Sequence, residues 1–406
     1  MRGRDFGWLW GAYAVSSLGT WLAFDAFALI AILVLHAGPA QVSALAAAGL
    51  AAGAAVAVPL GPWVERRRKR PVMVAMDLLR FAALASVPLS FALGRHGFAQ
   101  LVAVAVLVAA ADITFKAASG AYLKGLVAPD HLLTANGRFE ATTWTTTAVG
   151  PPLGGVLIAA LGPVATVVAN AVSFLLSALG LGAIGSGEPA PAARATPAAA
   201  GARARLGELV VGWRTILRHP VLRALFFNTV LVNALILATA PLLAVLMLGR
   251  LGFAPWEYAL AFGAPCAGGL LGARLAPRLV ARHGAGAVLR GAGTLRACWS
   301  LGLAFVIPGA PGLLLVIALQ TGLVFSVGLF NPVFATRRLE LTPSDRIART
   351  LAAWSVTSSL TVAATTALWG ALATLAGLRP AIAAAGLLLL ATPLLLPRRA
   401  AVTAPA

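Results

Sequence analysis

Long apolar runs dominate the chain, and short segments containing glycine, proline or charged residues separate them. Each run has about 20 residues or more, enough for a helix to cross the hydrocarbon core of a bilayer. Because backbone amides in lipid need internal partners, each run predicts a transmembrane helix. The sequence therefore predicts an all-α integral membrane protein. We expect twelve transmembrane helices, at residues 8–35, 42–63, 72–93, 98–119, 137–160, 164–184, 221–248, 256–279, 287–307, 312–335, 348–376 and 380–397.

The basic residues indicate the orientation of these helices. An even number of spans puts both termini on one side, and most of the 31 Lys and Arg residues fall on that side. The opposite side receives only Arg95, Arg250 and Arg379. Short cytoplasmic loops collect cationic residues. We therefore predict a multi-pass protein of the inner (plasma) membrane with both termini in the cytoplasm.

Composition narrows the function classes. Apolar residues make up 60% of the chain and charged residues 11%, against about a quarter charged in soluble domains. The net charge of +19 lies in gaps between apolar runs, so it indicates topology and not nucleic-acid binding. Cys266 and Cys298 lie singly inside apolar runs, and no nucleotide, zinc-hydrolase or nucleophile-elbow motif occurs. We expect no enzymatic activity, no cofactor and no metal.

A segment rich in Ala, Pro and Gly follows the sixth run and lacks periodicity, which is typical of a linker. At the end of the linker, apolar residues at helical spacing predict an amphipathic helix. This helix lies on the cytoplasmic membrane surface or, as an equal alternative, packs on the bundle. The predicted domains are an N-terminal six-helix half at 1–184, the cytoplasmic linker with its helix at 185–220, and a C-terminal six-helix half at 221–406.

The two halves resemble each other. The pair Leu79-Arg80 returns as Leu295-Arg296 in the second half. Four other residues return at one common displacement and at matching places, which argues for a parallel duplication. They are Phe115, Leu126, Asp130 and Gly155, which recur as Phe330, Leu341, Asp345 and Gly370.

The loop after the second run has the densest charge, with five consecutive cations after Glu65. A glycine at the end of a span permits close helix contact, and the carboxylate can sit at a helix N-terminus of the other half. Asp77 and Arg80, one helical turn apart in the third run, can pair with this loop. The loop is either a latch between halves or a plain cytoplasmic loop. The candidate latch residues are Gly61, Glu65, Arg66, Arg70, Asp77 and Arg80.

The fifth run contains Gly150, Pro151, Gly154 and Gly155. Proline removes a backbone donor and opens the helix, while glycines leave a smooth groove for a neighbouring helix. This combination predicts a bendable contact that controls an outer gate. The alternative is a packing kink without a role in transport.

Both motifs resemble those of the major facilitator superfamily. The charged loop is similar to its loop 2–3 signature, with Glu65 in the acidic position and Arg68 replacing a glycine, and the fifth run is similar to its exporter motif. Residues 17–21, 126–136 and 208–223 resemble the drug-proton antiporter branch, which includes macrolide and siderophore exporters. The resemblance implies two six-helix halves around a midplane cavity and a latch role for the loop. Lys116 departs from the branch, which usually has proline there.

Ionisable residues inside the spans are costly unless paired or wetted, so each is a functional candidate. Asp25 lies past the middle of the first run with no cation within a helical turn. It is the main proton-carrier candidate, or else a structural carboxylate bonded to a neighbouring helix. Asp112 and Lys116 stand four residues apart and can pair on one helix face. This pair is either self-neutralising or broken by substrate or proton during transport.

Uncharged polar and aromatic side chains within the spans supply a possible substrate cavity. The polar groups either join helices or line water. The cavity candidates are Trp21, Phe24, Thr143, Trp144, Thr147, Asn228, Asn233, Gln320 and Phe325.

These features predict a secondary active transporter that exports a small amphiphilic compound, such as a drug, a macrolide-like metabolite or a siderophore, by proton antiport with alternating access. An alternative is a lipid or lysolipid flippase of the same fold, and a remote alternative is a membrane sensor that transports nothing. The expected partners are the small-molecule substrate, protons and the lipid bilayer, and we expect a monomer.

Overall fold

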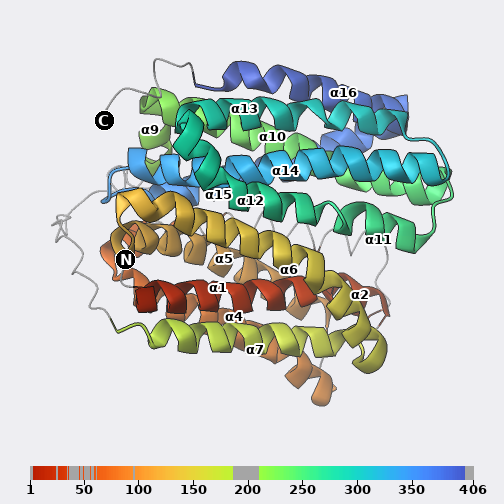
Figure 1. The fold of residues 1–406 in the computed structure, drawn as a ribbon. Coiled ribbons are helices and arrows are strands. Elements are labelled where there is room, and N and C mark those ends of the chain that lie inside the picture. The colour runs from red at the N-terminus through yellow and green to blue at the C-terminus, as the bar shows by residue number, and fades with distance from the viewer. Residues whose placement is uncertain are drawn as a thin grey trace. The chain divides into compact units, whose positions relative to one another are not determined.

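The computed structural model describes residues 3–23, 26–33, 35, 45, 49, 55, 59–60, 62–94, 97–185 and 210–397. Across these residues all regular secondary structure is helical, as predicted. The α-helices, labelled in Figure 1, are α1 (Gly3–Leu22), α2 (Ala26–Leu33), α4 (Lys69–Ala92), α5 (Phe98–Leu126), α6 (Leu132–Leu161), α7 (Pro163–Gly182), α9 (Val211–Arg218), α10 (Pro220–Ala244), α11 (Pro255–Gly263), α12 (Cys266–His283), α13 (Ala285–Cys298), α14 (Ala310–Leu341), α15 (Ile347–Ala376) and α16 (Leu378–Ala391).

Several helices end in short segments of another helical type. A π-helix at Val245–Arg250 continues α10, and 3₁₀ turns follow α13 at Ser300–Phe305 and α16 at Thr392–Leu395. A further 3₁₀ turn, Pro129–His131, precedes α6. In the described residues, the predicted linker helix is α9, which begins at Val211.

Within the described residues, seven helical segments are long and apolar enough to cross a membrane. Two of the remaining predicted runs are each divided between two α-helices. The first is divided between α1 and α2, and the eighth between α11 and α12 at Pro265, whose ring nitrogen has no hydrogen to continue the helix. The seven segments are Lys69–Ala92, Phe98–Leu126, Pro163–Gly182, Pro220–Arg250, Ala310–Leu341, Ile347–Ala376 and Leu378–Leu395.

The chain forms two compact units, each built mainly from one predicted half together with one segment of the other. Unit 1 is Met1–Leu132, Val149–Thr215 and Thr342–Ser359, and unit 2 is Leu133–Ala148, Ile216–Leu341 and Leu360–Ala406. The first half of α6 therefore belongs to unit 2, and the beginning of α15 belongs to unit 1.

Apolar side chains fill the centre of each unit. In unit 1, α4 packs against α5 and α7, and α7 also packs against α1; the buried core includes Leu84, Leu101 and Phe174. In unit 2, α14 packs against α12 and α13, and α10 against α16, over a core that includes Leu242 and Ile382. Burial of these side chains holds neighbouring helices in register.

Glycines set the closest helix contacts in both units. In unit 1, a Cβ at Gly150 would overlap Trp21, and one at Gly154 would overlap the backbone carbonyl of Leu22. In unit 2, a Cβ at Gly272 or at Gly328 would meet the backbone of the facing helix in the α12–α14 pair. Small residues allow such approach in membrane helices. Gly150 and Gly154 of the fifth-run motif thus allow α6 to lie close against α1.

Gly154→Ala should destabilise the protein, whereas Gly155→Ala should not. A methyl group at position 154 has no space against Leu22, and such overpacking typically costs about 1–3 kcal/mol. At Gly155 no atom lies within 4 Å of the place that a methyl carbon would occupy, so this position is the matched control. Thermal unfolding midpoints in one detergent measure the difference. Equal midpoints for the two variants would contradict the packing described for α6.

Candidate functional site

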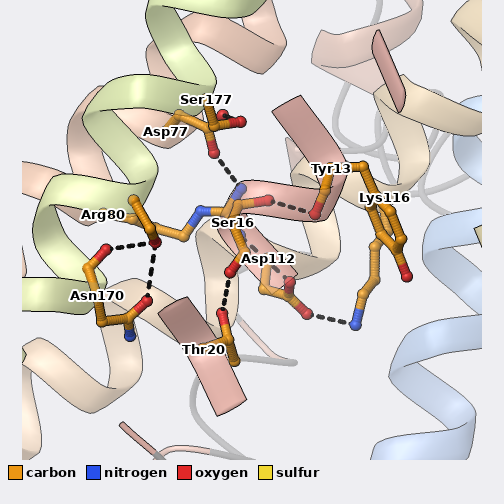
Figure 2. A network of polar contacts seen from close by, with 10 residues as sticks. Tyr13, Ser16, Thr20, Asp77, Arg80, Asp112, Lys116, Asn170 and Ser177 are labelled. Carbon is orange, nitrogen blue, oxygen red and sulfur yellow. Dashed lines mark hydrogen bonds and ion pairs between the residues drawn. The ribbon is translucent and has the colours of Figure 1, made fainter. Parts of the chain in front are cut away.

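Unit 1 contains a network of charged side chains that is buried at Asp77 and Arg80 and more exposed at Asp112 and Lys116 (Figure 2). On α4, Arg80 donates a hydrogen bond to Asp77, which also accepts one from the Ser177 hydroxyl on α7 at 2.7 Å. On α5, Asp112 accepts from Arg80 at 3.3 Å and pairs with the Lys116 ammonium at 2.7 Å. The predicted pairing of Asp112 with Lys116 is confirmed. Two carboxylates and two cations make the network formally neutral.

Helical spacing brings these groups together. Asp77 and Arg80 are three residues apart and Asp112 and Lys116 four apart, so each pair shares a helix face. The Arg80 guanidinium lies 4.2 Å from the ring centre of Phe174 and 4.6 Å from that of Phe115. These rings cover the cation where water is excluded and attract it through their π faces. Asp77 and Arg80 therefore pair with each other inside the unit, a different arrangement from the predicted pairing with the charged loop.

Polar side chains of α1 and α7 line the same region (Figure 2). The hydroxyls of Ser16 and Thr20 donate to backbone carbonyls within α1, and Ser173 donates to the carbonyl of Asn170 in α7. A Cβ at Gly19 would overlap Ser173, so α1 approaches α7 closely at this point.

Unit 2 contains a partial copy of this arrangement. Arg296 on α13 stacks over the Phe330 ring at 3.6 Å, as Arg80 stacks on Phe115. Its guanidinium donates to the Asn228 side chain, whose amide nitrogen donates to the carbonyl of Thr392 at 2.8 Å. In the described part of the chain, no carboxylate pairs with Arg296. The duplicated halves therefore share the stacked arginine but not its acidic partners.

A second ion pair ties the charged loop to the start of α15, within unit 1. The Arg349 side chain pairs with Glu65, and the Arg349 backbone N–H donates to the second oxygen of that carboxylate at 3.2 Å. Arg349 is in the first turn of α15, where amides lack intrahelical acceptors and the helix dipole favours an anion. Burial raises the pKa of Glu65, and Arg349 opposes the rise.

Cations of the same loop stabilise its backbone. The Lys69 ammonium donates to the carbonyls of Val64, Glu65 and Arg67, which closes the turn before α4. Arg70 donates to the carbonyls of Leu181 and Gly182, the last residues of α7. A cation is favourable at the carbonyl end of a helix. Arg66 is exposed.

The linker helix α9 packs on the same part of α15. The Trp213 indole donates to the Thr357 hydroxyl at 2.9 Å, and a Cβ at Gly212 would overlap the backbone carbonyl of Arg349. Trp213 also packs against Ile113 and Val356. The helix is thus packed on the bundle through its apolar face, the second of the two placements that the sequence left open.

Of the cavity candidates, those on α6 are engaged locally. Thr143 and Thr147 donate to carbonyls one turn earlier in the helix. The Trp144 ring covers Gly269 of α12, and its indole N–H donates to Glu140 at 2.9 Å. Glu140 lies near the beginning of the fifth predicted run, but its partner Asn331 on α14 could not be predicted from the sequence.

The remaining candidates differ in exposure. Asn228 is fully buried and bonded to Arg296, so its amide is not available to a cavity in this structure. Asn233 is exposed, whereas Gln320 and Phe325 are partly buried. Trp21 packs against Gly150. Phe24, Asp25 and Gly61 lie outside the described residues.

Comparison with known proteins identifies the family. A family model described as the Major Facilitator Superfamily matches residues 9–360. The chain belongs to this superfamily. Members of the superfamily are transporters of small molecules and not enzymes, and together with the apolar helices this makes the chain a multi-pass membrane protein.

Relatives with a curated name match only part of the chain. Proteins named multidrug efflux pump Tap, from Mycobacterium bovis and Mycobacterium tuberculosis, are 31% identical over 192 residues. The match covers 44% of this chain and 42% of those relatives. The chain thus matches less than half of their length.

Solved structures share the fold. The human organic anion transporter MFSD10 superposes with a TM-score of 0.77 at 16% identity, over 97% of this chain and 99% of that one. A bacterial homologue of the iron transporter ferroportin, in an outward-facing state, gives 0.76 at 19% identity over 96% and 98%. The Escherichia coli fucose:proton symporter gives 0.73 at 12% over 96% and 97%. At these identities the similarity shows the major facilitator fold alone.

Asp77→Ala should destabilise the protein strongly, because it leaves the buried Arg80 with only one carboxylate. Breaking a buried ion pair by removing one partner costs about 3–5 kcal/mol. Lys116→Ala is the control, since 63% of its side chain is exposed and an exposed pair contributes about 1 kcal/mol or less. Unfolding in detergent with increasing denaturant measures both. A smaller loss for Asp77→Ala than for Lys116→Ala would contradict the network.

Proposed function

We propose that this protein is a secondary active transporter of the inner (plasma) membrane that exports a small amphiphilic compound by proton antiport, with both termini in the cytoplasm. The observation that carries the proposal is the ion pair between Glu65 and Arg349. Export as the direction is supported by the Tap relatives, which are named efflux pumps.

The ion pair suits a latch between the two predicted halves. Glu65 follows the second predicted span and Arg349 begins the eleventh, so both lie at the cytoplasmic ends of their helices under the proposed topology. A transporter that works by alternating access must break such a contact to open toward the cytoplasm and reform it to open outward. The contact is formed here, which corresponds to a closed cytoplasmic side in this proposal.

Other residues have supporting roles in the cycle. Gly150 and Gly154 give α6 and α1 a close contact with little side-chain interlock, on which the outer gate can move. The remaining polar and aromatic candidates, with Trp21 and Gln320 among them, are proposed to line the substrate path. We assign the exchanged proton to Asp25, because a carboxylate in a span is costly as an anion and can be neutralised by protonation.

Substrate added to everted vesicles that contain the protein should dissipate an imposed pH gradient, and Asp25→Asn should abolish this coupling. The amide keeps the shape of the carboxylate but cannot release a proton. A panel of drugs, macrolides and siderophores, followed with a pH-sensitive dye, provides the measurement. Wild-type rates in the Asn variant would remove Asp25 from the mechanism. Lipid flipping without pH dependence would instead favour a flippase.

Glu65→Gln should open the cytoplasmic side more often, because an amide cannot form the ion pair with Arg349. Ala348 is fully buried beside Arg349, so a cysteine there reports opening. In a background with Cys266 and Cys298 replaced by serine, Ala348→Cys should react faster with an impermeant maleimide when Glu65→Gln is added. Arg67→Gln, an exposed change in the same loop, is the control. Equal labelling rates in both variants would contradict the latch.

A further inference from the structure

The carboxylate of Glu140 has an environment unlike that of Asp77, Asp112 and Glu65. Asp77, Asp112 and Glu65 each pair with at least one arginine or lysine. Glu140 instead accepts hydrogen bonds from the Trp144 indole at 2.9 Å and from the Asn331 amide at 2.8 Å. In the described part of the chain, no cation forms an ion pair with it. Its negative charge is therefore not held by an opposite charge.

The two hydrogen bonds of Glu140 converge on the same oxygen. Both Trp144 Nε1 and Asn331 Nδ2 donate to Oε1. The other oxygen, Oε2, accepts no hydrogen bond from the described residues and is not among the side-chain atoms that are sealed from solvent without a partner. A proton can therefore bind Oε2 while Oε1 keeps both donors, because the carbonyl oxygen of a neutral carboxyl group still accepts hydrogen bonds. Protonation and deprotonation leave neither Trp144 nor Asn331 without its acceptor.

Packing holds this carboxylate in position inside unit 2. Gly269 of α12 leaves space for the Trp144 ring, since a Cβ there would overlap the indole. One turn before Glu140, Asn136 donates to the Thr336 hydroxyl of α14 at 2.9 Å. The first half of α6 is thus fixed against α12 and α14, and the donors of Glu140 come from rigid helices.

The corresponding positions of the two units differ in charge beside Glu140 and beside Asp112. Asn331 follows Phe330 as Lys116 follows Phe115. In unit 1 the lysine at this position pairs with Asp112, whereas in unit 2 the asparagine donates to Glu140. A neutral amide at this place lets the carboxylate change its charge, while an ammonium favours the anion.

Other charged groups lie on the same three helices. Arg338 stands two turns beyond Asn331 and lies 4.8 Å from the ring centre of Phe334. The remaining titratable and charged groups of these helices are Arg138 on α6, Cys266, Arg274, Arg278, Arg282 and His283 on α12, and Arg337 and Glu340 on α14, the last two of which pair at 3.2 Å.

We propose that Glu140 is a second proton-exchanging carboxylate of the transport cycle, beside Asp25, and that Trp144 and Asn331 keep it in place in both protonation states. The proposal rests on the proposed proton antiport. Protonation forms an O–H bond at Oε2, and release returns the proton to water on the side to which the site is open.

Tryptophan fluorescence of the purified full-length protein in nanodiscs tests the protonation itself. The part of the emission that Trp144→Phe removes should change with pH in a single step. Glu140→Gln, which keeps the Oε1 acceptor and the side-chain shape, should abolish the step. Asn331→Lys should move its midpoint to lower pH by about 1–3 units, because a nearby cation favours the carboxylate. A step that persists in Glu140→Gln, or a midpoint unchanged in Asn331→Lys, would overturn the proposal.

Vesicle transport separates this inference from the proposed function. Wild-type protein should dissipate the pH gradient with substrate, and Glu140→Gln should release fewer protons for each substrate molecule transported, because Asp25 remains. If the wild type couples transport to protons and Glu140→Gln does so equally, the role of Glu140 is overturned but proton antiport is not. A wild type that moves substrate without any proton flux would overturn antiport and, with it, this role, whatever the fluorescence titration gives.

Discussion

A charge inside a membrane protein needs a partner, and this constraint explains the arrangement of most of the polar groups described. The buried Arg80 has two carboxylates, two aromatic faces and, through Asp77, the Ser177 hydroxyl. Leaving any of these charges alone in a low-dielectric interior costs several kcal/mol. The network therefore joins α4, α5 and α7 in addition to their apolar packing.

The arrangement of polar groups also depends on close helix packing, because side chains of two helices contact one another only when the helix backbones lie close together. Gly272 and Gly328 bring α12 and α14 together, and Gly150 and Gly154 do so for α6 and α1. These contacts use backbone surfaces with few interlocking side chains. Such surfaces can slide or rock with little repacking, which suits helices that must move in a transporter of this superfamily.

The sequence predicted what depends on local spacing. Apolar run lengths predicted helices, and the separation of Asp112 and Lys116 predicted their ion pair. The breaks in the first and eighth runs were missed, because apolar content alone does not distinguish a continuous helix from two shorter ones. The position of Glu65 at a helix N-terminus of the other half was also predicted, and the contact with the first turn of α15 confirms it. The identity of its partner, Arg349, was not predicted, because that residue lies far away in the chain. Likewise, an amide side chain in a span either bonds to another helix or lines a water-filled cavity. Asn228 bonds to Arg296, and the sequence does not predict this contact.

Duplication explains why the two units differ in charge while sharing a framework. Arg80 on Phe115 and Arg296 on Phe330 are equivalent stacked pairs, so the arginine lies on an aromatic ring in both units. The acids are not required for this placement, and in unit 2 an amide, Asn228, accepts from the arginine instead. Unit 2 also contains an acid that forms no ion pair with a cation among the described residues. Glu140 is such an acid, and a carboxylate that no cation holds is the kind of group whose charge can change during a transport cycle.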